Sequence, residues 1–260
     1  MSNLTLHSEA SWQARVAHAF SRAAPRYDVL ATAQRQIGEM LWGSLPPHAV
    51  NVLDMGCGTG YWTQRLAERY PNARITGLDL APGMLEQARQ RHGKNIHWQP
   101  GDAAALPFNR HSFDLAFSNL AVQWCQDIGG VMAELYRVLT PGGQAHITTL
   151  LPGTLKEVAH AWQRPEALLQ TPDRGSVERA ILDRGLSIVR QTATVERFYY
   201  PDLKAVMASI KGVGAQIARP QASLSRNDIA AAQARFEQLR QPDGLPVSYH
   251  CLTLQLEKSL

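Results

Sequence analysis

The chain has 260 residues, of which 45% are hydrophobic and 18% charged, so it can bury a core without disulfides or metals. Its three cysteines, Cys57, Cys125 and Cys251, are far apart, and its nine histidines are scattered. This argues against a disulfide framework and a metal site. No apolar run is long enough to span a membrane, and the N-terminal segment lacks a signal-peptide pattern, so we expect a cytoplasmic protein that does not bind membranes.

The net charge of +4 is unevenly distributed along the chain. Between Lys204 and Arg240, six basic residues stand against two acidic ones, an excess equal to that of the whole chain. This stretch is either a solvated helical surface or a docking face for an acidic partner. Because the basic residues are spaced apart, nucleic acid is not the expected partner.

Apolar runs and their breakers predict alternating strands and helices in the first 150 residues. Short apolar runs that end at Gly or Asp predict strands, and amphipathic stretches predict helices. Such alternation implies βαβ units and a parallel sheet with helices on both faces. The predicted elements are helices 11–21 and 33–45, strand 51–55, helix 61–70, strand 74–79, helix 82–91, strands 96–99 and 113–118, helix 128–139 and strand 144–150.

The pattern changes after residue 150. Helical segments at 155–169 and 176–183 precede a long alternating strand at 187–199, a helix-rich stretch at 202–239 and a last strand at 247–256. We expect a single α/β domain over residues 1–260, with a Rossmann-like, seven-stranded, mostly parallel sheet. Residues 11–45 are expected to form an N-terminal helical cap, and residues 201–246 a helical lid inserted before the last strand.

A glycine-rich loop follows the first predicted strand and leads into a helix. Residues 54–60 read Asp-Met-Gly-Cys-Gly-Thr-Gly, and their glycines permit a tight turn and close approach of the backbone to a ligand. The helix N-terminus beyond contributes free N–H groups and positive potential. A dinucleotide-binding loop has its third glycine where this chain has Tyr61, and the Gly-Lys-Ser/Thr of a phosphate-binding P-loop is absent. The loop therefore favours a ligand without a pyrophosphate, such as S-adenosylmethionine (SAM).

Carboxylates follow three consecutive strands of the predicted sheet. Asp54 is placed to receive the ammonium group of SAM, and Asp79 to accept from both ribose hydroxyls. Asp102 can accept a hydrogen bond from the adenine amino group, and the backbone of Ala103 can recognise the adenine ring. Each acid alone could cap a turn or a helix. Because open α/β sheets bind ligands at the carboxyl ends of their strands, the three together predict a SAM site, with Asn119 beside the sulfonium.

Further segments are more specific than this loop. Residues 118–125 read Ser-Asn-Leu-Ala-Val-Gln-Trp-Cys and residues 211–215 read Lys-Gly-Val-Gly-Ala. Together with 52–60, 77–80, 20–27, 34–35, 134–138 and 249–250, they resemble the malonyl-acyl-carrier-protein O-methyltransferases of biotin synthesis, within the class I SAM-dependent methyltransferases. The resemblance covers about 16–256 and implies methyl transfer from SAM to the free carboxylate of malonyl-acyl carrier protein. The loop itself leaves open a methyltransferase for another small acid or a quinone precursor, or a SAM-binding scaffold without catalysis.

The resemblance also implies roles for individual residues. A carboxylate is already ionised at neutral pH, so methyl transfer needs alignment and exclusion of water but no general base. Tyr27 is expected to close over the methionine end of SAM and Arg35 to pair with its carboxylate, while Lys211 and Tyr249 orient the malonyl group. Trp124, and Gln123 beside it, are expected to wall the substrate.

Each of these side chains also has a purely structural interpretation. The resemblance further implies an acidic carrier protein as partner, and we expect it to dock on the basic stretch 204–240. The catalytic candidates are Tyr27, Trp124, Lys211 and Tyr249, and the cofactor candidates are Tyr27, Arg35, Asp54, Gly56, Cys57, Gly58, Gly60, Asp79, Leu80, Asp102, Ala103 and Asn119.

Overall fold

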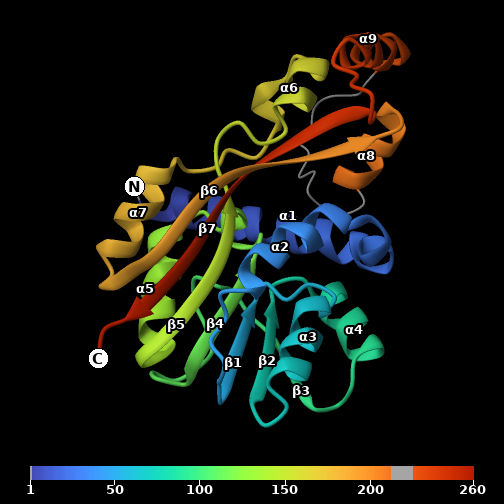
Figure 1. The fold of residues 1–260 in the computed structure, drawn as a ribbon. Coiled ribbons are helices and arrows are strands. Elements are labelled where there is room, and N and C mark those ends of the chain that lie inside the picture. The colour runs from blue at the N-terminus through green and yellow to red at the C-terminus, as the bar shows by residue number, and fades with distance from the viewer. Residues whose placement is uncertain (1, 212–224) are drawn as a thin grey trace.

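One seven-stranded sheet organises the molecule in the computed structural model, which describes residues 2–211 and 225–260. The strands are β1 (Asn51–Met55), β2 (Arg74–Asp79), β3 (Ile96–Pro100), β4 (Phe113–Asn119), β5 (Leu139–Leu150), β6 (Leu186–Tyr200) and β7 (Leu245–Lys258). They are ordered β3-β2-β1-β4-β5-β7-β6; β7 pairs antiparallel with both β5 and β6, and the other pairings are parallel. The predicted α/β fold with a mostly parallel sheet is confirmed (Figure 1).

Helices cover both faces of the sheet, as predicted. They are α1 (Ser2–Leu30), α2 (Thr32–Trp42), α3 (Tyr61–Arg69), α4 (Pro82–Arg91), α5 (Ile128–Val138), α6 (Lys156–Trp162), α7 (Arg174–Leu182), α8 (Leu203–Lys211) and α9 (Arg226–Glu237), with 3-10 turns η1 (Val122–Trp124) and η2 (Pro165–Ala167). Successive strand residues point to opposite faces. Val52 therefore packs with α2 and α3, whereas Leu53 packs with α5 and α7.

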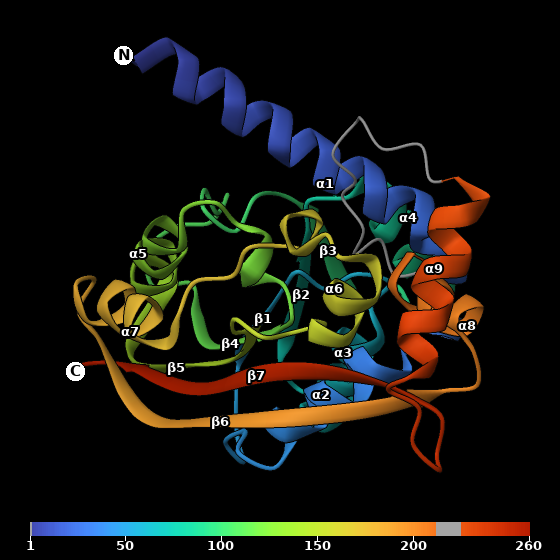
Figure 2. The same ribbon diagram turned by 90° about the horizontal axis from the view of Figure 1, so that it is seen from above.

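The first helix is much longer than the predicted 11–21, since α1 runs from Ser2 to Leu30 with Pro25 inside it. Pro25 removes a single backbone donor, the one that would reach the carbonyl of Ser21. Packing on α4 supports this segment, and the Ser21 hydroxyl accepts a hydrogen bond from the N–H of Gly83 at 3.1 Å. Tertiary contacts thus support the helix beyond Ser21, where the predicted element ended. Figure 2 shows α1 as a long rod with its C-terminal half beside α4.

One end of the β6–β7 pair extends beyond the rest of the sheet. Figure 1 shows β6 and β7 extending past the other strands toward α6, α8 and α9. Helices α8 and α9 stand between β6 and β7 in the chain, where residues 201–246 were expected to form a lid; this covering role stays a prediction. Of the specific motif at 211–215, residues 212–215 lie outside the described residues, as does Arg219 of the basic stretch.

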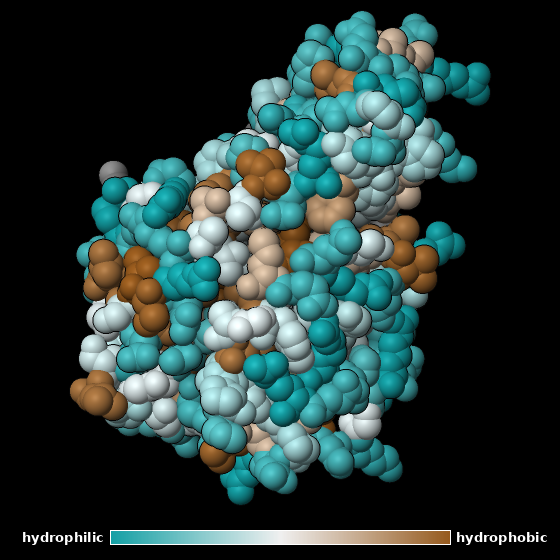
Figure 3. Space-filling model, viewed as in Figure 1, coloured by the Kyte–Doolittle hydropathy of each residue, from teal (hydrophilic) through white to brown (hydrophobic). Residues whose placement is uncertain are grey.

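The exposed surface is mixed in character. Figure 3 shows apolar residues as separate patches among hydrophilic ones on the face that it presents. Within residues 2–211 and 225–260, no helix is long and apolar enough to cross a membrane. The expectations of a cytoplasmic location and of no metal stay predictions.

Candidate cofactor and acceptor site

The glycine-rich loop between β1 and α3 adopts the backbone that its glycines permit. Gly56, Gly58 and Gly60 have φ of 77°, 57° and 87°, a region that disfavours other residues. The N–H groups of Gly56 and Cys57 both donate to the carbonyl of Leu78, at 2.8 and 2.9 Å. A Cβ on Gly56 would lie 2.2 Å from the Cβ of Ala121, after β4. The loop is therefore held between the ends of β2 and β4.

Gly60 has a packing reason to be glycine. A Cβ there would lie 2.6 Å from Cη2 of Trp98 and 2.7 Å from Cδ2 of His92. The His92 ring is also within 3.0 Å of the carbonyl of Thr59. Gly60 thus lets these rings approach the loop, and its contact with cofactor stays a prediction.

Asp54 lies at the end of β1 and is almost completely buried, with 2% of its surface exposed. The Thr63 hydroxyl donates to Asp54 Oδ2 at 2.6 Å. Burial raises the pKa of this carboxyl from 3.8 to about 7, although the hydrogen bond opposes the shift and the nearby Asp79 adds to it. A buried carboxylate whose single described hydrogen-bond donor is neutral is suited to receive a cation.

Asp79 lies at the end of β2 and is oriented by backbone groups. Its Oδ1 accepts from the N–H of Ala81 and its Oδ2 from the N–H of Gly58, both at 2.8 Å. Burial raises its pKa, while these backbone hydrogen bonds act in the opposite direction. Each carboxylate oxygen keeps a second lone pair, so the fixed carboxylate can still accept from a pair of hydroxyls.

Asp102 follows β3, and its two oxygens also have partners. Oδ1 accepts from the N–H of Ala104 at 3.0 Å, and Oδ2 accepts from Nε2 of Gln13 on α1 at 2.7 Å. Because β1, β2 and β3 are paired in parallel, Asp54, Asp79 and Asp102 meet at one edge of the sheet. Three carboxylates beside a loop with glycine at positions 56, 58 and 60 fit the ammonium, ribose and adenine groups of SAM.

Two charged residues of α5, Glu134 and Arg137, hold the loop that follows Asp102. Glu134 Oε2 accepts from the N–H of Leu106 at 2.7 Å. Arg137 donates to the carbonyls of Leu106 and Phe108 at 2.9 and 2.6 Å, and also pairs with Glu134. The ion pair lowers the pKa of Glu134, so the pair stays charged at neutral pH.

Tyr27, near the end of α1, interacts electrostatically with side chains of three other elements. Its pKa is raised first by burial and further by the charge of Asp79, whereas Arg35 on α2 opposes the shift. Tyr249 on β7 is 5% exposed, and its raised pKa reflects burial together with electrostatic contributions that include Tyr27. Tyr27 therefore lies within electrostatic range of Arg35, Asp79 and Tyr249, although they are far apart in sequence. The Arg35 guanidinium also lies 5.1 Å from the centroid of the Tyr61 ring.

Both polar atoms of the Asn119 side chain form hydrogen bonds within the protein. Its Nδ2 donates to the carbonyl of Gln34 at 2.9 Å, and its Oδ1 accepts from the Thr148 hydroxyl at 2.6 Å. The next residue, Leu120, has a φ of 52°, which turns the chain sharply at the end of β4. Asn119 therefore links β4 to α2 and β5, and its place beside the sulfonium stays a prediction.

Trp124 lies under α1. Its ring meets that of Phe20 edge-on at 5.3 Å, and its carbonyl accepts from Nε1 of Trp12 at 2.9 Å. Gln123, 7% exposed, donates to the carbonyl of Leu120 at 2.6 Å. Both residues make contacts within the protein, and a role as a substrate wall stays a prediction.

The remaining candidates have simpler surroundings. Lys211 is exposed at the end of α8 and forms no ion pair with any described residue. Cys57 is buried, and burial raises the pKa of its thiol, so this side chain is a small neutral group and not a reactive thiol. Leu80 is partly buried after β2, and Ala103 packs at the margin of the main core.

The sequence analysis missed the residues of α1 that contact this edge of the sheet. Asp28 accepts from the Thr59 hydroxyl at 2.6 Å and forms an ion pair with Arg91, so it ties α1 to the glycine-rich loop and to α4. Gln13 reaches Asp102 in the same way. A single polar residue in a helix carries no local signal of such a contact.

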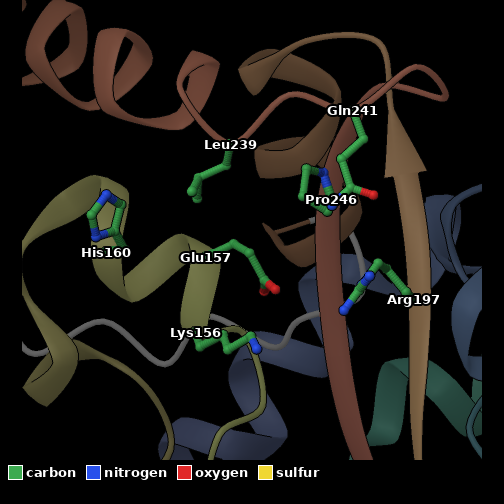
Figure 4. A pocket seen from close by; sticks show the side chains of 7 residues that line it. All are labelled: Lys156, Glu157, His160, Arg197, Leu239, Gln241 and Pro246. Carbon is green, nitrogen blue, oxygen red and sulfur yellow. The ribbon is translucent and has the colours of Figure 1, made fainter.

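A separate hollow lies at the far end of the β6–β7 pair. Its volume is about 320 Å³, and Figure 4 shows Lys156 and Arg197 pointing toward the carboxylate of Glu157. That carboxylate already accepts from the N–H and hydroxyl of Ser248, at 3.0 and 2.7 Å. None of the predicted site residues lines this hollow, whose walls are Lys156, Glu157, His160, Arg197, Leu239, Gln241 and Pro246.

The fold and the site together define a class I SAM-dependent methyltransferase. A family model described as a methyltransferase domain matches residues 52–143. A putative methyltransferase from Bacillus halodurans shares the fold with a TM-score of 0.64 at 13% identity, over 86% of this chain and 100% of that one.

Comparison with named relatives identifies the family to which the chain belongs within this class. A malonyl-[acyl-carrier protein] O-methyltransferase from Serratia marcescens is 40% identical over 245 residues, covering 90% of this chain and 92% of the relative. The chain belongs to this family. The biotin biosynthesis bifunctional protein BioHC from Cellvibrio japonicus is 39% identical over 252 residues, and the chain spans half of its length.

Proposed function

We propose that the chain transfers the methyl group of SAM to the free carboxylate of malonyl-acyl carrier protein. The resulting methyl ester would serve as the primer of the pimeloyl moiety of biotin. The observation that carries this proposal is the identity of about two fifths, sustained over nine tenths of the chain, with a relative named for this activity. The name of the bifunctional relative supports a place in biotin synthesis.

The chemistry of the site suits a carboxylate acceptor. When bound, SAM would supply a methyl group on a sulfonium. The acceptor oxygen would form the new bond to carbon, the electron pair of the carbon–sulfur bond would stay on sulfur, and no proton would move. Tyr27 and Tyr249 have raised pKa values, so their hydroxyls stay protonated and can donate to the acceptor carboxylate. Because these donors are neutral, they hold the carboxylate less tightly than a cation would and leave its oxygen free to react. We assign these two residues to the acceptor carboxylate, with Trp124 and Lys211 at the margins of the acceptor.

The basic stretch 204–240 is the proposed docking face for the acidic carrier protein. Lys204, Lys211 and Arg226 are exposed, and none pairs with a carboxylate among the described residues. By contrast, Arg240 is engaged by Glu237, and Arg235 donates to the carbonyl of Ala161. We therefore assign docking to the first three, on helices of the proposed lid. Steering by such exposed charges weakens with added salt.

Mass spectrometry tests the reaction directly. Malonyl-acyl carrier protein incubated with SAM and the protein should gain one methylene, and esterase should remove it. Malonyl-CoA and a quinone precursor, supplied in parallel, establish the acceptor class. Catalytic efficiency with the carrier protein should fall with salt and in Lys204→Glu, whereas Lys94→Glu, an exposed change on the far α4–β3 connection, is the control. Methylation of the quinone alone would refute the proposal, and salt-independent efficiency would refute the docking face.

A further inference from the structure

Helix α1 reaches the part of the site where the base of SAM is expected. Gln13 spans 89 residues of sequence to donate from Nε2 to Asp102 Oδ2 at 2.7 Å. Its neighbour Trp12 donates to the carbonyl of Trp124 at 2.9 Å, which fixes the rotation of α1 at this level. A helix from outside the sheet thus supplies a polar side chain to the loop after β3.

The donor and acceptor pattern at this point is specific. Asp102 uses Oδ1 for the N–H of Ala104 and Oδ2 for Gln13. The donation from Nε2 leaves the carbonyl oxygen of Gln13 as an acceptor, and no residue in the described ranges donates to it. An adenine amino group carries two N–H donors, whereas a purine with a carbonyl at that position offers an acceptor.

We propose that Gln13 is a specificity-determining residue of the cofactor site. Its carbonyl oxygen and the Asp102 carboxylate together accept the two hydrogens of the adenine amino group. The donation from Nε2 holds the amide in the orientation that this requires. The proposal rests on SAM as cofactor and not on the identity of the methyl acceptor.

A purely structural role for Gln13 makes a different prediction. The Gln13–Asp102 hydrogen bond is exposed, and such bonds contribute little to stability. If the contact served only to hold α1 in place, its loss would change the affinity for every nucleoside ligand by the same factor. A base-reading role instead changes the discrimination between bases.

Calorimetric titration with S-adenosylhomocysteine and with its deaminated analogue, S-inosylhomocysteine, separates the two roles. In Gln13→Ala, we expect the affinity for the adenine ligand to fall about fivefold, while that for the analogue is unchanged. Gln90→Ala is the control, because Gln90 is an exposed helical glutamine whose hydrogen bonds, to Glu86 and from Gln87, stay within α4. Thermal unfolding checks that both variants fold.

Unchanged discrimination in Gln13→Ala, including an equal loss for both ligands, would overturn the proposal. If the unaltered protein bound neither ligand, the cofactor assignment would fall and this proposal with it. Failure to methylate malonyl-acyl carrier protein leaves the binding readout intact, so the two failures are distinguishable.

Discussion

Asp54 should make the affinity for SAM depend on pH. Its pKa is raised to about 7 by burial in the ligand-free protein. The ammonium of SAM is expected at this carboxylate, and an adjacent cation favours the ionised form. Binding therefore lowers the pKa of Asp54 and releases its proton.

The size of the effect follows from that pKa. With a value of about 7, roughly a tenth of Asp54 is ionised at about pH 6 and roughly nine tenths at about pH 8. Since SAM binds the ionised form, its Kd should fall about tenfold across this interval.

Calorimetric titration of SAM at several pH values measures this dependence. Asp54→Asn is the control, because the asparagine oxygen can still accept from Thr63 while the side chain no longer titrates. Titration of the amino group of SAM affects both proteins, so the ratio of their Kd values isolates Asp54. An unchanged ratio between about pH 6 and 8 would refute the reasoning.

The same pKa sets the sign of a stability effect. Between about pH 4 and pH 7 the folded protein holds the Asp54 proton more tightly than the unfolded chain does. The contribution of Asp54 to stability therefore falls as pH rises through this window. The difference in Tm between Asp54→Asn and the unaltered protein should shift in favour of the variant as pH rises, and a constant difference would contradict the assignment.

Three further substitutions test the site and its support. Asp79→Ala should abolish or badly weaken SAM binding in calorimetry, and wild-type affinity would remove the ribose assignment. Gly60→Ala should cost about 2 kcal/mol in chemical unfolding, because its φ is 87° and its Cβ would lie 2.6 Å from Trp98. Gly93→Ala is the control, because the added Cβ would meet no atom beyond its chain neighbours within 4 Å; its cost is expected to be within about 0.5 kcal/mol. Arg137→Ala should raise the Kd of SAM severalfold by loosening the loop after β3, with the KM of the methyl acceptor unchanged; equal changes in both constants would exclude this role.

The sequence by itself determined the sheet and its cofactor edge. Alternating strands and helices require a parallel sheet, and parallel strands place their carboxyl ends at one edge. The sequence alone therefore predicts that Asp54, Asp79 and Asp102 share one edge, and the parallel pairing of β1, β2 and β3 agrees with this prediction. The glycines at positions 56, 58 and 60 were expected to permit a tight turn, and each has a positive φ.

Only the tertiary structure decided how the other elements meet this edge. It placed Tyr249 from the last strand within electrostatic range of Tyr27 from the first helix, and it joined Gln13 to Asp102. It bonded Asn119 to Gln34 and Thr148. It also extended α1 through a proline. The physical reason is the range of the interactions: local periodicity and turn chemistry reflect neighbours along the chain, whereas these contacts depend on how helices and strands distant in sequence pack together.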